Sequence, residues 1–189
     1  MDSEKIDKLL KLHIEIGKKY CEVKENFNVC VNGVFLPPKS KPRFDVVFVG
    51  INPSTTGQKS SNSDEIGNWN ISKTDKLFQE YLRKYKLEGS YATDFSHFGR
   101  AESKTNKITE DELKQFADFF VREIEIIQPK IIVCFGDKSY RLVLGFIKDN
   151  KIKILKFWHP GASKRGHGKD KLLKKWDEQF HKLKANLPE

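Results

Sequence analysis

Short runs that are mainly apolar alternate along this chain with longer segments of helical periodicity. The runs lie at residues 46–49, 91–95, 131–135 and 152–158. A continuously apolar run is typical of a strand that is covered on both faces of a parallel sheet. The helical segments between the runs supply the crossovers that parallel strands require. The sequence therefore predicts an α/β fold, a three-layer α/β/α sandwich with a central four-stranded parallel sheet.

Apolar residues recur at helical spacing in five segments. These segments cover residues 6–20, 77–85, 113–127, 140–147 and 172–183. Thr109 and Glu112 form the pattern of a capping box at the start of the third helix, and Pro129 ends that helix. Gly136 and Asp137 are expected to turn the chain and to cap the fourth helix.

The length of 189 residues fits one domain with a single sizeable core. The content of 38% hydrophobic residues excludes intrinsic disorder of the whole chain. We expect one domain over residues 1–189. Residues 1–44 would hold an N-terminal helix and a small hairpin around Asn32-Gly33, a dipeptide that accepts positive φ. Residues 45–189 would form the α/β core with a basic C-terminal helix.

No apolar run approaches the length of a membrane span, and the N-terminal residues lack the apolar segment of a signal peptide. We therefore expect a cytoplasmic, nucleoid-associated monomer without a membrane partner. The three cysteines, Cys21, Cys30 and Cys134, match neither a zinc site nor an iron–sulfur site in their spacing. Free thiols are expected, with Cys134 buried, and no metal or cofactor is predicted.

The net charge is +9, and much of the excess lies near the C-terminus. Residues 151–189 hold eleven Lys or Arg and four Asp or Glu. This pattern favours a polyanionic partner such as DNA. A Lys-rich surface without such a partner explains the charge equally well, so charge alone does not decide between them.

Ligands of open parallel sheets bind beyond the carboxyl ends of the strands, so the segments after the predicted strands hold the candidate site. Two of these segments contain a polar residue before a proline: Asn52 precedes Pro53, and His159 precedes Pro160. Proline restricts the preceding residue to extended backbone. Asn52 and His159 are therefore expected to be held in defined directions at one edge of the sheet.

These motifs resemble those of the uracil-DNA glycosylase superfamily. Its mismatch-specific branch carries G-I-N-P-G after the first strand, and its members carry H-P-S-P-L or N-P-S-G-L after the fourth. Here the counterparts are G-I-N-P-S at residues 50–54 and H-P-G-A-S at residues 159–163. Residues 91–95 and 129–140 are similar to the family's second strand and to its P-x-x-(apolar)-L-G-K-x-A-Y stretch. The resemblance covers residues 45–166.

The resemblance implies a monofunctional DNA glycosylase of base excision repair that flips a deaminated or mismatched base out of DNA and hydrolyses its N-glycosidic bond. By the same resemblance, Asn52 would position the attacking water, and His159 would donate a hydrogen bond to the departing base. The substrate-binding residues would be Gly50, Ile51, Pro53, Ser54, Asp94 and Trp69. The DNA-binding residues would be Gly161, Ser163, Lys164, Arg165 and Lys169. Trp69 either stacks on the base or has a core or hinge role.

The chain departs from the family pattern at three of these positions, Asp94, Gly161 and Ser163. Asp94 stands where many members have Asn and where the mismatch-specific branch can have Lys. An ionised carboxylate only accepts hydrogen bonds, so a base that presents an amine or a ring N–H fits Asp94 better than uracil does, unless Asp94 is protonated. Ser163 stands where members insert Leu into the gap left by the flipped nucleotide, and Lys164 or Arg165 could fill that gap instead.

These departures motivate an alternative function, a nucleic-acid-binding member of the same fold whose catalysis is lost or altered. A nucleotide-binding α/β module is disfavoured because no Gly-rich phosphate loop follows any predicted strand.

Overall fold

The computed structural model describes residues 2–27, 29–30, 32–36, 41–51, 73–99, 108–159 and 168–187. In these residues the central sheet has five strands in the order β2-β4-β3-β6-β7. The strands are β2 (Val34–Phe35), β3 (Arg43–Gly50), β4 (Ser90–Asp94), β6 (Ile131–Phe135) and β7 (Lys153–Phe157). The predicted α/β class is confirmed. The four predicted strands are parallel, but β2 adds a fifth, antiparallel strand beside β4, so the sheet is mixed.

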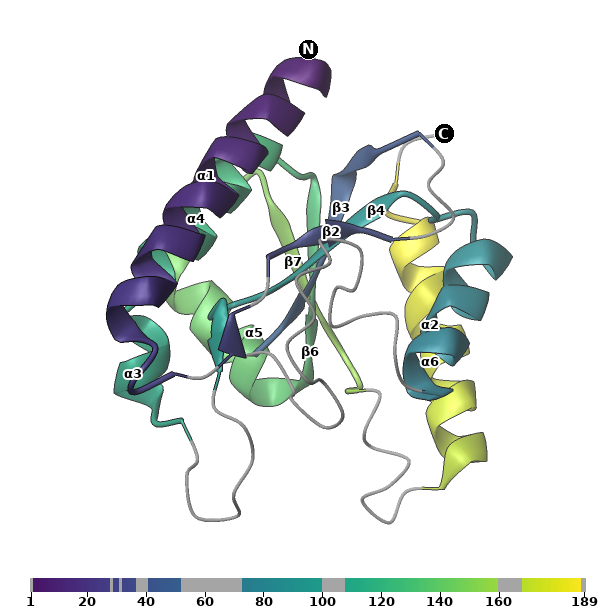
Figure 1. Cartoon of the computed structure of the whole chain (residues 1–189). Helices are drawn as coiled ribbons and strands as arrows, with labels where there is room; N and C mark the ends of the chain where they lie inside the picture. The colour runs from purple at the N-terminus through teal and green to yellow at the C-terminus, as the bar shows by residue number, and fades with distance from the viewer. Residues whose placement is uncertain are drawn as a thin grey trace.

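Helices cover both faces of this sheet (Figure 1). The described residues form α1 (Asp2–Val23), α2 (Lys73–Lys84), α3 (Glu110–Lys114), α4 (Ala117–Ile127), α5 (Gly136–Phe146) and α6 (Lys169–Lys184). One face packs against α2 and α6, and the other packs against α1, α4 and α5. Figure 1 shows α1 beside α4 on one side of the sheet and α2 beside α6 on the other. This is the three-layer arrangement that the sequence predicts.

The side chains of β3 explain why its sequence is apolar at consecutive positions. Val46 and Phe48 face the layer of α2 and α6, whereas Val47 and Val49 face the layer of α1, α4 and α5. Successive side chains of a strand point to opposite faces, so a strand covered on both sides must be apolar throughout. All four side chains are fully buried.

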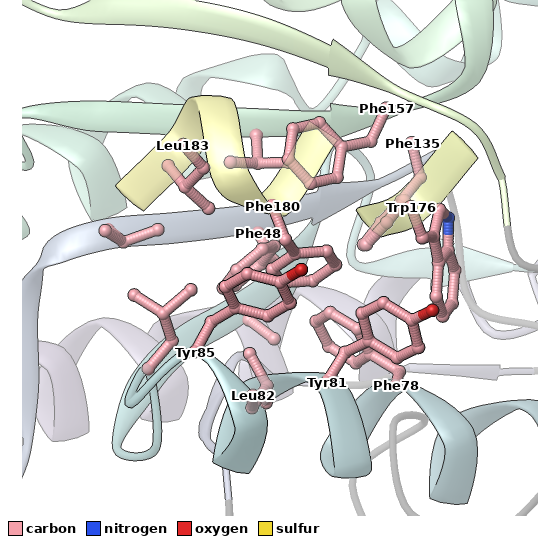
Figure 2. Packing of buried hydrophobic residues seen from close by; sticks show 14 of the residues in the cluster. Phe48, Phe78, Tyr81, Leu82, Tyr85, Phe135, Phe157, Trp176, Phe180 and Leu183 are labelled. Atoms are coloured by element: carbon pink, nitrogen blue, oxygen red, sulfur yellow. The ribbon is translucent and has the colours of Figure 1, made fainter. Parts of the chain in front are cut away.

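The cluster between the sheet, α2 and α6 is mainly aromatic (Figure 2). Phe78 of α2 meets Phe48 edge-on, with 5.0 Å between the ring centroids, and Trp176 and Phe180 of α6 lie 6.1 and 6.3 Å from Phe78. Such pairs contribute about 0.5–1.5 kcal/mol each beyond the burial of their area. This packing holds α6 firmly against the sheet beside β7.

The predicted hairpin around Asn32-Gly33 is wrong. The short strand β1 (Val29–Cys30) pairs with β5 (Phe98–Gly99), and β2 pairs with β4, so the two segments join different sheets. Gly33 is required for a different reason, because a Cβ at this position would collide with the ring of Tyr91. The glycine therefore permits a close approach of backbone to a buried ring.

The helix predicted from the capping box is divided in two. Thr109 caps α3 and exchanges bonds with Glu112, as predicted. The helix then breaks at Phe116, whose φ of −117° and ψ of 20° precede α4. Phe116 is buried against Phe98, 4.5 Å away, and against Phe27, 5.5 Å away. This packing is a tertiary contact that the helical spacing does not reveal.

The predicted cap of α5 is also wrong. Phe135 occupies the N-cap position without a side-chain cap, and Gly136 is the first helical residue with a φ of +85°. Asp137 instead lies in the first turn, where its carboxylate accepts a hydrogen bond from Lys156 at 2.7 Å. Negative charge in the first turn favours the helix through its dipole.

Candidate active site

The carboxyl ends of β3 and β4 lie side by side. Gly50 is the register partner of Asp94. The pairing continues past both strands, because the N–H of Phe95 donates to Gly50 O at 3.2 Å and the N–H of Ser96 donates to Ile51 O at 2.9 Å. The structure thus brings three predicted substrate-binding residues, Gly50, Ile51 and Asp94, to one place.

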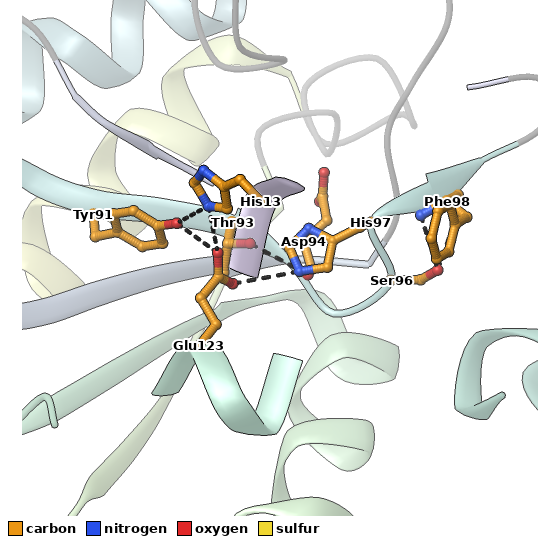
Figure 3. Close-up of polar contacts among 8 residues, drawn as sticks. All are labelled: His13, Tyr91, Thr93, Asp94, Ser96, His97, Phe98 and Glu123. Atoms are coloured by element: carbon orange, nitrogen blue, oxygen red, sulfur yellow. Dashed lines mark hydrogen bonds and ion pairs between the residues drawn. The ribbon is translucent and has the colours of Figure 1, made fainter. Parts of the chain in front are cut away.

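Asp94 is the last residue of β4, and only 6% of its surface is exposed. Figure 3 shows its side chain pointing away from Glu123, a buried carboxyl that lies on α4. A carboxylate that is largely shielded from water binds hydrogen-bond donors selectively. The position of Asp94 at the strand end therefore suits recognition of a polar ligand.

The first turn of α5 is fastened to the end of β3. The hydroxyl of Ser139 is fully buried and lies 3.1 Å from both Val49 O and Gly50 O. A single hydroxyl hydrogen is shared between the two carbonyls, so Ser139 holds the peptide that leads into Ile51. The sequence analysis did not select Ser139 as a site residue. Its signal was a small polar residue in the first turn of a helix directly after a buried strand.

His159 follows β7 and is exposed. A Cβ added to Gly136, the residue directly after β6, would lie 3.7 Å from His159 Cβ. His159 therefore stands against the turn between β6 and α5. The ends of all four parallel strands meet at one edge of the sheet, which is where ligands of such sheets bind.

Several predicted site residues lie outside the described residues. They are Asn52, Pro53, Ser54 and Trp69, and Gly161, Ser163, Lys164 and Arg165. The described residues therefore stop at Ile51 after β3 and at His159 after β7. Lys169 is described as an exposed residue at the start of α6.

A second group of polar side chains is buried beneath the end of β4 (Figure 3). Tyr91 donates to Glu123 Oε1 at 2.5 Å, and His13 Nε2 lies 3.1 Å from the Tyr91 hydroxyl and 3.5 Å from Glu123 Oε1. The Nε2 atom of His97 lies 3.6 Å from Glu123 Oε2. Tyr91 has one hydroxyl hydrogen and gives it to Glu123, so its oxygen accepts from His13, whose Nε2 must carry hydrogen. The cluster joins α1, β4, α4 and the segment after Asp94.

The electrostatics of this cluster favour a charged Glu123. Burial raises the pKa of its carboxyl, but the electrostatic interactions with His97 and His13 and the hydrogen bonds from His13 and Tyr91 outweigh burial, so the pKa lies below its ordinary value. Burial and the Glu123 charge raise the pKa of Tyr91 well above its ordinary value. The sequence signal for Glu123 was a charged residue on the apolar face of its helix, three positions after Phe120.

Two cysteines of the described residues, Cys30 and Cys134, are not suited to nucleophilic chemistry. Cys134 is buried, as predicted, and burial raises the pKa of its thiol to about 12. Burial likewise raises the pKa of the Cys30 thiol to about 12. Thiolate is the reactive form, so neither side chain is activated as a nucleophile at neutral pH.

Within the described ranges, no group of three or more His, Cys, Asp or Glu side chains is arranged to hold a metal ion. The same part of the chain contains no helix that is long and apolar enough to span a membrane.

Comparison with known families adds one match to this geometry. The family model of the Uracil DNA glycosylase superfamily matches residues 37–184, a range that includes all four strand ends and α6. No individual curated protein matches the chain at a significant level.

Proposed function

The chain belongs to the uracil DNA glycosylase superfamily, and we propose that it is a monofunctional DNA glycosylase acting on a deaminated or mismatched base. The observation that carries this proposal is the meeting of Gly50-Ile51, Asp94 and His159 at one edge of the sheet. These are the ends of strands that carry the two family motifs. The resemblance of G-I-N-P-S to the motif of the mismatch-specific branch makes a T·G or U·G pair a substrate to test first.

The proposed chemistry divides between the two motifs. Asn52 follows Gly50 and Ile51, whose carbonyl oxygens accept from the Ser139 hydroxyl and the Ser96 N–H respectively, and its amide would position the water that attacks C1′. An amide cannot take up a proton as a carboxylate can, so the bond to the base must already be largely broken. His159 would then donate a hydrogen bond to the departing base and stabilise the negative charge that develops there.

Asp94 is the proposed reader of the base. Its burial at the strand end supports this role, because a base edge that enters the site would meet a carboxyl group that is largely shielded from water. A carboxylate would select a base with a ring N–H or an amine, whereas a protonated Asp94 would also accept a carbonyl. Trp69 is proposed to stack on the flipped base.

The DNA backbone is proposed to follow the basic segment between β7 and the start of α6. Lys169 stands exposed at the start of α6 and is well placed to contact a phosphate. The remaining proposed DNA contacts are Gly161, Ser163, Lys164 and Arg165. Lys164 or Arg165 would fill the gap left by the flipped nucleotide.

Base release under single-turnover conditions tests the proposal. Labelled oligonucleotides would carry uracil, hypoxanthine, xanthine or a T·G mismatch, in single and double strands, and alkali-labile abasic sites would be scored. Asn52→Ala should abolish release while DNA binding is kept, and His159→Ala should slow release by about 10²-fold or more. Asn186→Ala, the same change beyond α6 at the amino end of β7, should release base at the wild-type rate.

A second function is favoured by one feature, the acceptor-only chemistry of Asp94 at the reading position. It is a nucleic-acid-binding protein of the same fold with lost or altered catalysis. If no substrate in the panel releases its base but DNA binding is tight and salt-sensitive, the second function is selected. Release at the wild-type rate by Asn52→Ala would overturn the proposed mechanism.

A further inference from the structure

The strand that leads to His159 lies at the edge of the sheet. In the described sheet, β7 pairs with β6 on one side and has no strand on the other. The backbone groups on that open side still need hydrogen-bonding partners. Side chains of α6 provide these partners at the carboxyl end of β7, directly before His159.

Gln179 takes the place of a neighbouring strand. Its Oε1 accepts from the N–H of Trp158 at 3.1 Å, and its Nε2 donates to Lys156 O at 3.1 Å. The two backbone groups belong to residues two apart. One residue of a parallel strand makes the same pair of bonds, donating to one residue and accepting from the second residue after it. One side-chain amide thus extends the ladder past the edge of the sheet.

Trp176 holds the other backbone group of Trp158. Its indole N–H donates to Trp158 O at 2.9 Å. The Trp176 ring is fully buried and meets Tyr81 edge-on, with 5.3 Å between the ring centroids. Because the indole is fixed in the aromatic core, the carbonyl that accepts from it is fixed too. This carbonyl belongs to the peptide that joins Trp158 to His159.

We propose that Gln179 and Trp176 are positioning residues, which hold the peptide before His159 so that the imidazole points at the departing base. This inference rests on the proposed role of His159 as hydrogen-bond donor. The α6 clamp, defined as Gln179 and Trp176, fixes the chain before His159, and the following proline restricts the backbone of His159 itself to extended conformations. A displacement of about 1 Å at a catalytic group can cost on the order of 10²-fold in rate.

Gln179 is the better member of the α6 clamp to test. It is only partly buried, whereas the buried apolar face of α6 consists of Leu172, Trp176, Phe180 and Leu183. Removal of the Gln179 amide therefore leaves the core of the helix intact. Gln179→Glu provides a second variant, because its carboxylate keeps an acceptor for Trp158 N–H but would face Lys156 O without a donor.

The activity test compares base release by the single variants Gln179→Ala and His159→Ala with base release by the double variant. Gln179→Ala should slow single-turnover release about tenfold or more, while DNA affinity changes less than about twofold. The same substitution made in His159→Ala should cause no further loss, because the α6 clamp acts through His159. An equal loss in both backgrounds would overturn the positioning role. Tyr81→Phe, which removes a bond to Leu173 O on the same helix, should release base at the wild-type rate.

Amide hydrogen exchange tests the α6 clamp without reference to activity. The N–H of Trp158 should be protected in the wild-type protein and in Tyr81→Phe, and should exchange much faster in Gln179→Ala. Unchanged protection in Gln179→Ala overturns the inference even if the wild-type protein releases base. A wild-type protein that releases no base, with Trp158 protected as expected, overturns the proposed function and with it the catalytic role of the α6 clamp.

Discussion

The ends of β4 and β7 both lead to proposed site residues, but they are held in different ways. The strand β4 has neighbours on both sides, and all five of its residues are buried. The buried carboxyl of Glu123 binds the polar side chains around this strand. The strand β7 lies at the edge with two exposed residues, and a neutral amide and an indole hold its end.

The contrast follows from the different effective dielectric constants of the two regions. A charge–dipole cluster is strong where water is excluded, so Glu123 can tie α1, α4 and the segment after Asp94 together. An ion pair at the exposed edge would be screened and weak, whereas an amide replaces missing ladder bonds at little cost in desolvation. Changes near β4 should therefore reduce global stability, and changes at the end of β7 should alter geometry with little loss of stability.

Replacement of the buried carboxyl should have the largest effect. Glu123→Leu leaves Tyr91, His13 and His97 facing an apolar side chain, and we expect a loss of about 3–5 kcal/mol in the free energy of unfolding. Urea denaturation measures this loss. Glu125→Leu, the same change at an exposed position of α4, should alter stability by no more than about 0.5 kcal/mol. Equal losses in the two variants would contradict the contrast between the two strand ends.

Overpacking against Tyr91 should have the next largest effect. Gly33→Ala pushes a methyl group into the Tyr91 ring, which Glu123 and His13 hold in place, so we expect a loss of about 1–3 kcal/mol. Gly145→Ala is the matched control, because a Cβ at this position of α5 meets nothing within 4 Å. The control should raise stability by up to about 1 kcal/mol through helix propensity. A neutral Gly33→Ala, measured by thermal and urea unfolding, would show that the Tyr91 ring moves freely.

The acid dependence of stability should show a smaller effect of the same cluster. The pKa of Glu123 in the folded protein lies below the ordinary value of 4.5, so the folded state binds fewer protons than the unfolded state in acid. The stability that its carboxylate contributes is complete above pH 4.5 and is lost as the pH falls through the lower folded pKa. Glu123→Gln should therefore lose less stability than the wild-type protein on acidification from that pH. Parallel curves of unfolding free energy against pH would contradict this expectation.

Local patterns account for most of the secondary structure. The run at 131–135 predicts β6 at its observed bounds, and the three other predicted strands differ by a few residues at most. Continuous apolar runs identify β3 and β6 because the burial of these runs on both faces leaves no polar position. The capping box at Thr109 was predictable for a similar reason, since its two partners lie within one turn.

The contacts that hold the candidate site were not predictable in this way. Ser139 reaches a carbonyl 89 residues earlier in the chain, Tyr91 and Glu123 are 32 residues apart, and Gln179 reaches a carbonyl 23 residues earlier. The hairpin failed for the same reason, because the partners of β1 and β2 are distant strands that compete with the local turn.

The sequence by itself determined the alternation of strands and helices, the strand ends that meet at one edge, and the two motifs typical of the superfamily. These properties depend on residues that are near one another in the chain, whose spacing sets which face each side chain takes. Only the tertiary structure decided that Glu123 lies beneath the end of β4 and that Gln179 completes the edge of β7. The physical reason is that a buried charge or an unpaired backbone group is satisfied by whichever side chain packing brings near.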